Sequence, residues 1–301
     1  MKVGLGTVQF GLSYGVSNSE GQTPLEEVVE IVRFAASEEV RVLDTSPSYG
    51  VSEKVLGIAL KNAGLNAGLN AGLNARKDAG RMLLVTKTRP DLETPRQLRE
   101  DLDGSLRNLQ RPSVYALLVH RSADLLAGGG HALYAELNRL KDRGLVEKIG
   151  VSVYDAAEID QVLSRFPVDL MQVPVSVMDQ RLVASGHLKK MKDRGIEIHA
   201  RSVFLQGLLF LEPEKLRPNL KPLEPALRSF RGFAAERGMT PLEGALDFIA
   251  QIAEIDIAIC GVNTLGQLRG ILRAVPAHTG TEGWGMLSAN EEPFLNPAAW
   301  V

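Results

Sequence analysis

The chain has 301 residues, of which 45% are hydrophobic and 23% charged, and its formal net charge is -2. This balance is typical of a soluble globular protein and argues against nucleic-acid binding, which needs a clustered basic excess. No apolar run reaches the ~18 residues of a membrane span, and the start, MKVGLGTVQFG, lacks the hydrophobic region of a signal peptide. A single cysteine, Cys260, excludes an internal disulfide and a CxxC metal site. We therefore expect a cytoplasmic protein that binds neither a membrane nor a metal.

Short apolar segments rich in β-branched residues alternate with amphipathic segments along the whole chain. Most of the apolar segments are continuous rather than alternating, as expected of parallel strands that helices cover. The predicted strands are 2–8, 41–45, 82–87, 115–120, 148–153, 170–175, 197–204 and 255–262. Helix starts between them are marked by the cap candidates Thr23, Thr94, Asp155, Ser185 or Gly186, and Thr240.

This order of elements predicts an α/β fold, a parallel (β/α)8 TIM barrel, whose usual size is about 250 residues. An open doubly wound sheet is the alternative, but no GxGxxG follows the first strand. We expect one domain over residues 1–301. The excess length lies in the Asn-Ala-Gly-Leu repeat of 62–74, in a Pro-rich insert at 205–252 that we expect to act as a lid, and in the tail 276–301. The repeat lies in a helix-to-strand connection, where function is uncommon.

Four polar residues fall at or near the ends of consecutive predicted strands. Asp44, Lys87 and His120 end the second, third and fourth strands, and Tyr49 follows Asp44 by five positions. In a barrel these strand ends share one rim. A nearby ammonium lowers the pKa of a phenol, an aspartate keeps that ammonium charged, and an imidazole can orient a carbonyl oxygen. The set suits protonation of an oxygen during hydride reduction. The alternative for each residue alone is structural, as an ion pair or a core histidine.

At these residues the sequence resembles the aldo-keto reductase superfamily, over about residues 2–275. The most specific element is DTSPSYGxSExxLG, starting at Asp44. The resemblance implies an NAD(P)H-dependent oxidoreductase that reduces a small aldehyde or ketone to an alcohol. It also implies that Tyr49 is the general acid, that Lys87 and Asp44 tune its pKa, and that His120 orients the substrate. The other matching segments are GLGTVQFG, VTKTRP, LLVHR, GLVEKIGVSVYD, LMQVPVSVMDQRL, HARSVFLQGLL and ICGVNTLGQLRGIL.

The cofactor positions follow the family pattern less closely. Val153 replaces the usual asparagine beside Ser152, and Arg201 replaces an aromatic ring that would stack on the nicotinamide. Arg201 would bind the cofactor diphosphate, bind an acidic substrate, or form a structural salt bridge at the rim. The resemblance implies NADPH as the cofactor, but the arginine that commonly reads the 2′-phosphate is missing, so NADH is the alternative. The cofactor residues implied are Thr7, Ser152, Gln172, Arg201, Ser202, Phe204, Gly261, Asn263, Thr264 and Gln267.

Two other functions remain open on the sequence. The altered nicotinamide residues Val153 and Arg201 suit a cofactor-sensing subunit with little turnover. A barrel enzyme of another chemistry would use Lys87 as a Schiff-base amine.

Overall fold

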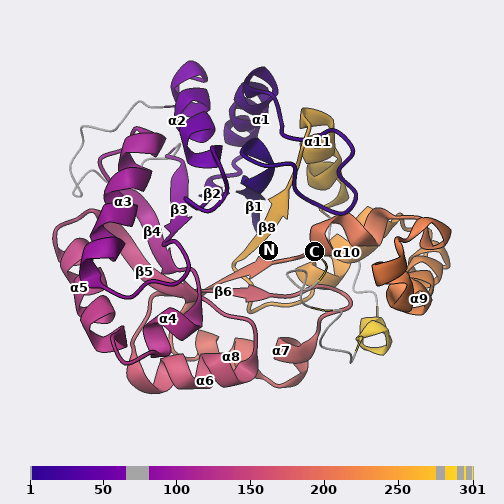
Figure 1. The fold of residues 1–301 in the computed structure, drawn as a ribbon. Helices are drawn as coiled ribbons and strands as arrows, with labels where there is room; N and C mark the ends of the chain where they lie inside the picture. Colours follow the sequence, from indigo (N-terminus) through magenta and orange to yellow (C-terminus); the bar gives the residue numbers. More distant parts are fainter. Residues whose placement is uncertain (1, 66–80, 276–281, 290–294, 296–299, 301) are drawn as a thin grey trace.

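In the computed structural model, which describes residues 2–65, 81–275, 282–289, 295 and 300, parallel strands close into a barrel in sequence order (Figure 1). Strand β1 pairs with β2 on one side and with β8 on the other, which closes the ring. The prediction of a (β/α)8 barrel is confirmed, and the open sheet is wrong. The strands are β1 Lys2–Gly6, β2 Val42–Asp44, β3 Leu83–Lys87, β4 Val114–Val119, β5 Val146–Ser152, β6 Leu170–Pro174, β7 Glu197–Arg201 and β8 Ile257–Gly261.

Helices surround the barrel on the outside (Figure 1). The cap side chains of Thr94, Asp155 and Thr240 accept backbone N–H groups as predicted, and Gly186 precedes its helix. Thr23 is not a cap, because its hydroxyl donates to the carbonyl of Asn263 instead. The helices are α1 Leu25–Ser37, α2 Ser52–Asn62, α3 Pro95–Leu109, α4 Ser122–Leu126, α5 Gly130–Asp142, α6 Ala156–Arg165, α7 Arg181–Ala184, α8 His187–Lys192, α9 Glu224–Ala235, α10 Pro241–Ala250 and α11 Leu265–Ala274.

Apolar side chains fill both faces of the strands. Successive strand residues point to opposite faces, so Val42 faces the barrel interior while Leu43 joins the layer between strands and helices. This double burial explains why the strand sequences are apolar without alternation. The interior cluster is Val42, Val85, Ala116, Leu118, Leu170, Ile257 and Ile259.

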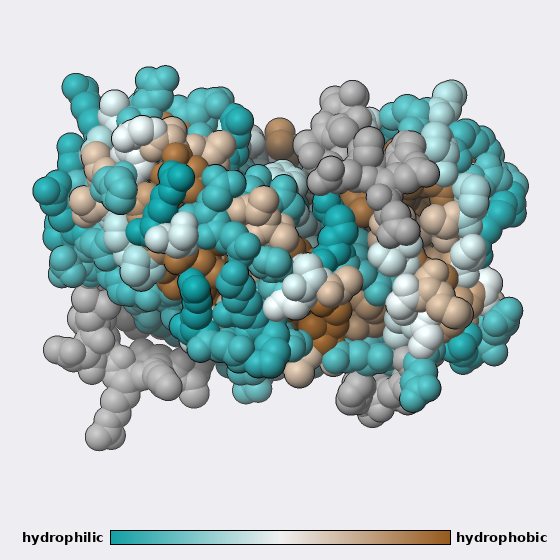
Figure 2. Space-filling view, turned by 90° about the horizontal axis from the view of Figure 1, so that it is seen from below, coloured by the Kyte–Doolittle hydropathy of each residue, from teal (hydrophilic) through white to brown (hydrophobic). Residues whose placement is uncertain are grey.

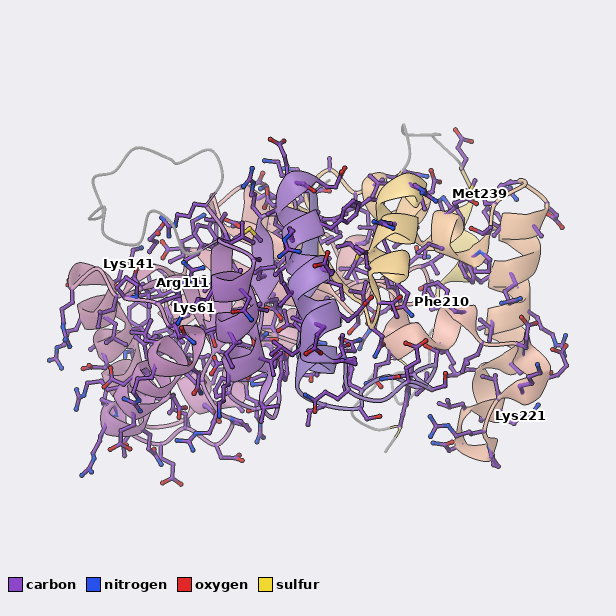
Figure 3. All side chains as sticks on the ribbon, turned by 90° about the horizontal axis from the view of Figure 1, so that it is seen from above. Lys61, Arg111, Lys141, Phe210, Lys221 and Met239 are labelled. Carbon is purple, nitrogen blue, oxygen red and sulfur yellow. The ribbon has the colours of Figure 1, made fainter. Side chains whose placement is uncertain are left out.

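The insert after β7 is folded rather than extended. It forms the short 3-10 helices η2 Leu205–Phe210, η3 Pro213–Lys215 and η4 Pro218–Leu223 before α9 and α10. Phe210 and Lys221 lie on the α9 side of the molecule (Figure 3). Residues 66–80, which hold most of the predicted repeat segment, and most of the tail lie outside the described residues.

Trp284, in the described part of the tail, packs against the outer helices. Its indole nitrogen donates to Asp247 at 3.0 Å, and its ring centroid lies 4.7 Å from that of Phe233 on α9. Seen from below, the surface is largely hydrophilic, with hydrophobic residues in separate patches (Figure 2). None of the described helices is long and apolar enough to cross a membrane.

A network of polar side chains lies at the end of the barrel where the strands begin. Glu197, the first residue of β7, accepts a hydrogen bond of 2.6 Å from Tyr115, forms an ion pair with Lys148, and contacts Nε2 of His199 at 2.7 Å. Burial alone would raise the pKa of Glu197, but these partners outweigh it and lower the pKa to about 2. Because this end of a barrel usually carries stability rather than chemistry, we interpret the network as structural.

Replacing Glu197 by glutamine is therefore expected to destabilise the protein at pH 7 by about 2 kcal/mol. The pKa of the carboxyl is lower in the folded than in the unfolded chain, so its contribution is complete above pH ~4.5 and is lost as the pH falls toward ~2. Urea unfolding followed by circular dichroism at several pH values measures both effects. The control is Glu147→Gln, in an exposed pair with Arg81, which should change stability by less than about 0.5 kcal/mol. Equal effects of the two variants would contradict the assignment.

Candidate active site

The four polar residues predicted from the strand ends meet at one rim of the barrel. Asp44 and Lys87 are the last residues of β2 and β3, His120 directly follows β4, and Tyr49 lies in the loop after β2. The ammonium Nζ of Lys87 donates to Asp44 Oδ1 at 2.6 Å, to the carbonyl of Thr45 at 3.1 Å and to the Tyr49 hydroxyl at 3.3 Å. The structure thus joins the carboxylate, the ammonium and the phenol in one chain of contacts.

The charges of this chain are almost fully buried. Lys87 is 1% exposed and Asp44 is 4% exposed. Such charges are stable only when they are paired and hydrogen-bonded. The second carboxylate oxygen of Asp44 accepts a hydrogen bond of 2.7 Å from Nε2 of Gln172 on β6. Each of the three hydrogens of Lys87 has an acceptor, which disfavours the Schiff-base role because that reaction needs a free amine.

Burial and charge act in opposite directions on the pKa values of the two central groups. Burial raises the pKa of Tyr49, and the ammonium of Lys87 opposes that rise without reversing it. The expected lowering of the Tyr49 pKa by Lys87 is therefore present, but it is smaller than the effect of burial. For Lys87, burial lowers the pKa, but the carboxylate of Asp44 outweighs this and the pKa is raised. The structure thus favours a protonated phenol beside a charged ammonium.

The imidazole of His120 has its hydrogen fixed on one nitrogen. Nδ1 lies 3.2 Å from the carbonyl oxygen of Thr88 and 3.4 Å from the hydroxyl of Ser46. Because a carbonyl only accepts, Nδ1 must carry the hydrogen. Burial, with a contribution from the charge of Lys87, lowers the pKa of His120 to about 4, so the ring is neutral at pH 7. Its Nε2 is then an acceptor, which disfavours the expected role of donating to a carbonyl oxygen.

We therefore expect His120 to be the neutral Nδ1–H tautomer at pH 7 and to gain its second proton only near pH 4. The 15N shifts of its ring nitrogens, followed by NMR from pH 8 to pH 4, measure both properties. The resonances are assigned by their loss in His120→Gln. A midpoint near 6.5, the value of a free imidazole, or a hydrogen on Nε2 would contradict this description of the site.

The predicted cofactor residues do not form one cluster of free side chains. Thr7 is fully buried, and its hydroxyl donates to the carbonyl of Asp44 at 3.0 Å, which fixes the end of β2. Ser152 and Gln172 are neighbours in the β5–β6 register, but Gln172 is engaged with Asp44. Phe204 packs against Phe210 with 5.2 Å between ring centroids and is buried, so it belongs to the core of the insert.

Arg201, the last residue of β7, turns toward the loop after β5. Its guanidinium lies 4.2 Å from the ring centroid of Tyr154 and donates to the carbonyl of Val153 at 3.2 Å. A second bond of 3.3 Å reaches the hydroxyl of Ser202. Tyr154 is not among the residues predicted from the sequence, although its position directly after Val153 is a usable signal.

The segment after β8 supplies the other predicted cofactor residues. Gly261 ends β8, and Thr264 caps α11 by accepting the N–H of Gln267 at 3.2 Å. Gln267 in turn accepts the N–H of Asn263 at 2.6 Å. Glu27 of α1, which the sequence analysis did not consider, accepts the N–H of Leu265 at 2.6 Å. Helices α1 and α11 lie side by side (Figure 3), so the carboxylate sits at the start of α11.

No group of three metal-ligating side chains able to hold an ion occurs among the residues that the structure describes. The polar rim is built instead from a phenol, an ammonium, a carboxylate and a neutral imidazole, the groups of a proton-transfer site on a (β/α)8 barrel.

Known proteins share both this sequence pattern and this fold. A sequence profile described as "Aldo/keto reductase family" matches residues 2–288. The aldo-keto reductase YhdN of Bacillus subtilis is 24% identical over 297 residues, which cover 90% of this chain and 83% of that protein. An uncharacterised oxidoreductase of Mycobacterium bovis is 26% identical over 293 residues, with 89% and 82% covered.

Solved structures of low sequence identity share the fold. The holo form of an aldo-keto reductase from Bacillus halodurans aligns with a TM-score of 0.73 at 18% identity, covering 98% of this chain and 95% of that one. An aldo/keto reductase from Klebsiella pneumoniae in complex with NADP and acetate aligns with a TM-score of 0.68 at 18% identity, covering 98% and 94%. The chain therefore belongs to the aldo/keto reductase family, and the family supports an oxidoreductase.

Proposed function

We propose that the protein reduces an aldehyde or ketone to an alcohol with a nicotinamide cofactor, and that Tyr49 is the proton donor. The observation that carries this proposal is the hydrogen bond of 3.3 Å from Lys87 Nζ to the Tyr49 hydroxyl, beside the buried pair of Lys87 and Asp44. If the ion pair of Lys87 and Asp44 had only a structural role, it would not need a phenol beside it. A phenol that touches a buried ammonium can lose its proton to a neighbouring oxygen, because the ammonium stabilises the phenolate that remains.

The roles of the side chains follow from their bonds. The cofactor, when bound, supplies a hydride to the carbonyl carbon. Tyr49 donates its proton to the carbonyl oxygen, Lys87 stabilises the phenolate, and Asp44 keeps Lys87 charged and in place. His120, with an unprotonated Nε2, has no hydrogen to give to the carbonyl oxygen and can accept the hydroxyl hydrogen of the alcohol only after Tyr49 has transferred its proton. This chain of groups also argues against a cofactor-sensing subunit, which has no use for a phenol held by an ammonium.

Tyr49→Phe is expected to lower kcat for reduction of a reactive aldehyde by about 10²–10⁴-fold, the usual contribution of a general acid. Binding of the cofactor should change by less than about twofold, because the phenol acts on the carbonyl oxygen. Absorbance of the reduced nicotinamide measures the rate, and protein fluorescence measures binding.

The matched control is Tyr134→Phe, whose phenol donates to the carbonyl of Pro167 on the outside of the barrel. It should leave the rate unchanged. Undiminished turnover in Tyr49→Phe, or no turnover by the wild-type protein on a broad aldehyde panel, would overturn the proposal.

The start of α11 fits an anionic group of the cofactor. The N-terminus of a helix attracts negative charge, and here the N–H groups of Asn263 and Leu265 are already bonded to side-chain oxygens of Gln267 and Glu27, with which a bound anion would compete. By family resemblance, this segment lies near the adenosine phosphate. The carboxylate of Glu27 would repel a 2′-phosphate there and compete with it for the N–H of Leu265. We therefore infer a preference for NADH over NADPH, with Asn263 and Thr264 near the adenosine and Ser152, Gln172 and Ser202 near the nicotinamide.

The wild-type protein is expected to bind NADH at least about tenfold more tightly than NADPH, a difference of ~1.4 kcal/mol. Glu27→Gln should reduce that ratio severalfold, because the amide keeps an acceptor for Leu265 but removes the negative charge. Fluorescence titration with each cofactor gives the dissociation constants.

Glu26→Gln is the control, since Glu26 is an exposed residue of the same helical turn. It removes the same charge without the contact and should leave the ratio unchanged. Tighter binding of NADPH by the wild-type protein would refute the role of Glu27.

A further inference from the structure

Arg201 is a charged side chain of the rim to which the proposed reaction gives no role. The sequence leaves three explanations: a salt bridge, the cofactor diphosphate or an acidic substrate. Among the residues that the structure describes, no carboxylate pairs with this half-buried guanidinium, which donates to the carbonyl of Val153 and the hydroxyl of Ser202. A salt bridge therefore does not explain it within that part of the chain. A half-buried cation without an anion is costly, and a bound anion would offset that cost.

The direction of the side chain separates the other two explanations. Strand β7 pairs with β6 on one side and with β8 on the other. The guanidinium stacks 4.2 Å from the ring centroid of Tyr154, which follows β5, so it reaches across the end of β6. It thus points toward the side where His120 follows β4, and away from β8 and α11, where the cofactor phosphates are proposed to bind. This direction favours an anion on the substrate.

The positive charge of Arg201 also acts on both groups that face the reacting oxygen. Burial raises the pKa of Tyr49, and the charges of Lys87 and Arg201 oppose that rise. Burial lowers the pKa of His120 to about 4, and the same two charges add to the shift. The positive charge of Arg201 therefore favours the phenolate form of Tyr49 and the neutral form of His120.

The backbone that follows Arg201 has strained torsion angles and is held by a hydrogen bond from another loop. Ser202, Leu205 and Gln206 have φ values of 60°, 48° and 56°, in the left-handed region that residues other than glycine rarely adopt. The carbonyl of Gln206 accepts the N–H of Val16 at 2.9 Å, so the loop after β1 holds the loop after β7. Backbone strain of this kind persists where surrounding contacts enforce it, commonly at binding sites.

We propose that Arg201 binds a carboxylate on the substrate, so that the protein prefers carbonyl compounds that carry a carboxylate over their neutral counterparts. This inference rests on the proposed carbonyl reduction. A guanidinium presents a planar fork of N–H groups that matches a carboxylate, and stacking on Tyr154 holds that plane in place. Tyr14, which is 36% exposed and hydrogen-bonds Gln206, adds an aromatic surface for the body of the substrate.

The test compares 3- and 4-carboxybenzaldehyde with the corresponding methyl esters, which keep the aldehyde and remove the charge. For the wild-type protein, kcat/KM should be at least about tenfold higher for one of the acids than for its ester. Arg201→Met should abolish that preference, and Arg201→Lys should restore part of it. Calorimetric titration of 3- and 4-carboxybenzoate into the protein with NADH present gives a binding readout that does not depend on turnover, and Arg201→Met should weaken it by a similar factor.

Arg121→Met is the matched control, because Arg121 lies beside His120 at the same rim but pairs with Asp91 at 2.5 Å. It should retain the preference for the acid. Equal kcat/KM for acids and esters in the wild-type protein overturns the proposal and leaves carbonyl reduction intact. Weaker NADH binding by Arg201→Met with an unchanged acid-to-ester ratio assigns Arg201 to the cofactor instead. If neither the acids nor the esters are reduced, carbonyl reduction fails, and the titrations alone decide whether Arg201 binds carboxylates.

Discussion

The buried pair of Lys87 and Asp44 is the constraint on which the rest of the rim depends. An ammonium that is 1% exposed stays charged only with a carboxylate beside it, and that carboxylate needs hydrogen bonds of its own. The second oxygen of Asp44 accepts a hydrogen bond from Gln172 on β6, and the hydroxyl of Thr7, which directly follows β1, donates to the backbone carbonyl of Asp44. One ion pair thereby fixes the ends of β1, β2, β3 and β6. The phenol of Tyr49 contacts the ammonium of Lys87, so its position depends on contacts that also hold the barrel together.

The two ends of the barrel use polar groups for different purposes. At the strand starts, the carboxylate of Glu197 contacts Tyr115, Lys148 and Nε2 of His199. At the strand ends, the hydroxyl of Tyr49 contacts Lys87, and Nδ1 of His120 contacts the carbonyl of Thr88, which leaves Nε2 as an acceptor. Between them lies the apolar interior cluster, which keeps the two sets of charges apart. This division matches the general pattern of (β/α)8 barrels, in which one end carries stability and the other carries chemistry.

The sequence predicts the fold and the polar rim because both depend on local patterns. Continuous apolar strands that end in Asp44, Lys87 and His120 indicate a barrel and its rim without knowledge of any contact. Glu27 lies outside such reasoning, since it meets Leu265 across a separation of 238 residues. Thr23 has the sequence of a cap but bonds Asn263 over 240 residues, so a tertiary contact replaces the local one. The tautomer of His120 depends on which carbonyl faces Nδ1, and only the three-dimensional structure specifies that.

Positive charge around Tyr49 determines what the site can stabilise. When hydride reaches a carbonyl carbon, negative charge develops on the oxygen, and preorganised cations lower the energy of that state more than that of the neutral carbonyl. Lys87 acts on one side of Tyr49, and the charge of Arg201 also reaches both Tyr49 and His120. A positive charge on His120 is unnecessary beside these two cations, and burial keeps the imidazole neutral. The histidine is thereby left with a lone pair, which suits the alcohol rather than the carbonyl. Arg201, at a position where the family resemblance implies an aromatic ring, thus adds positive charge that acts on both Tyr49 and His120.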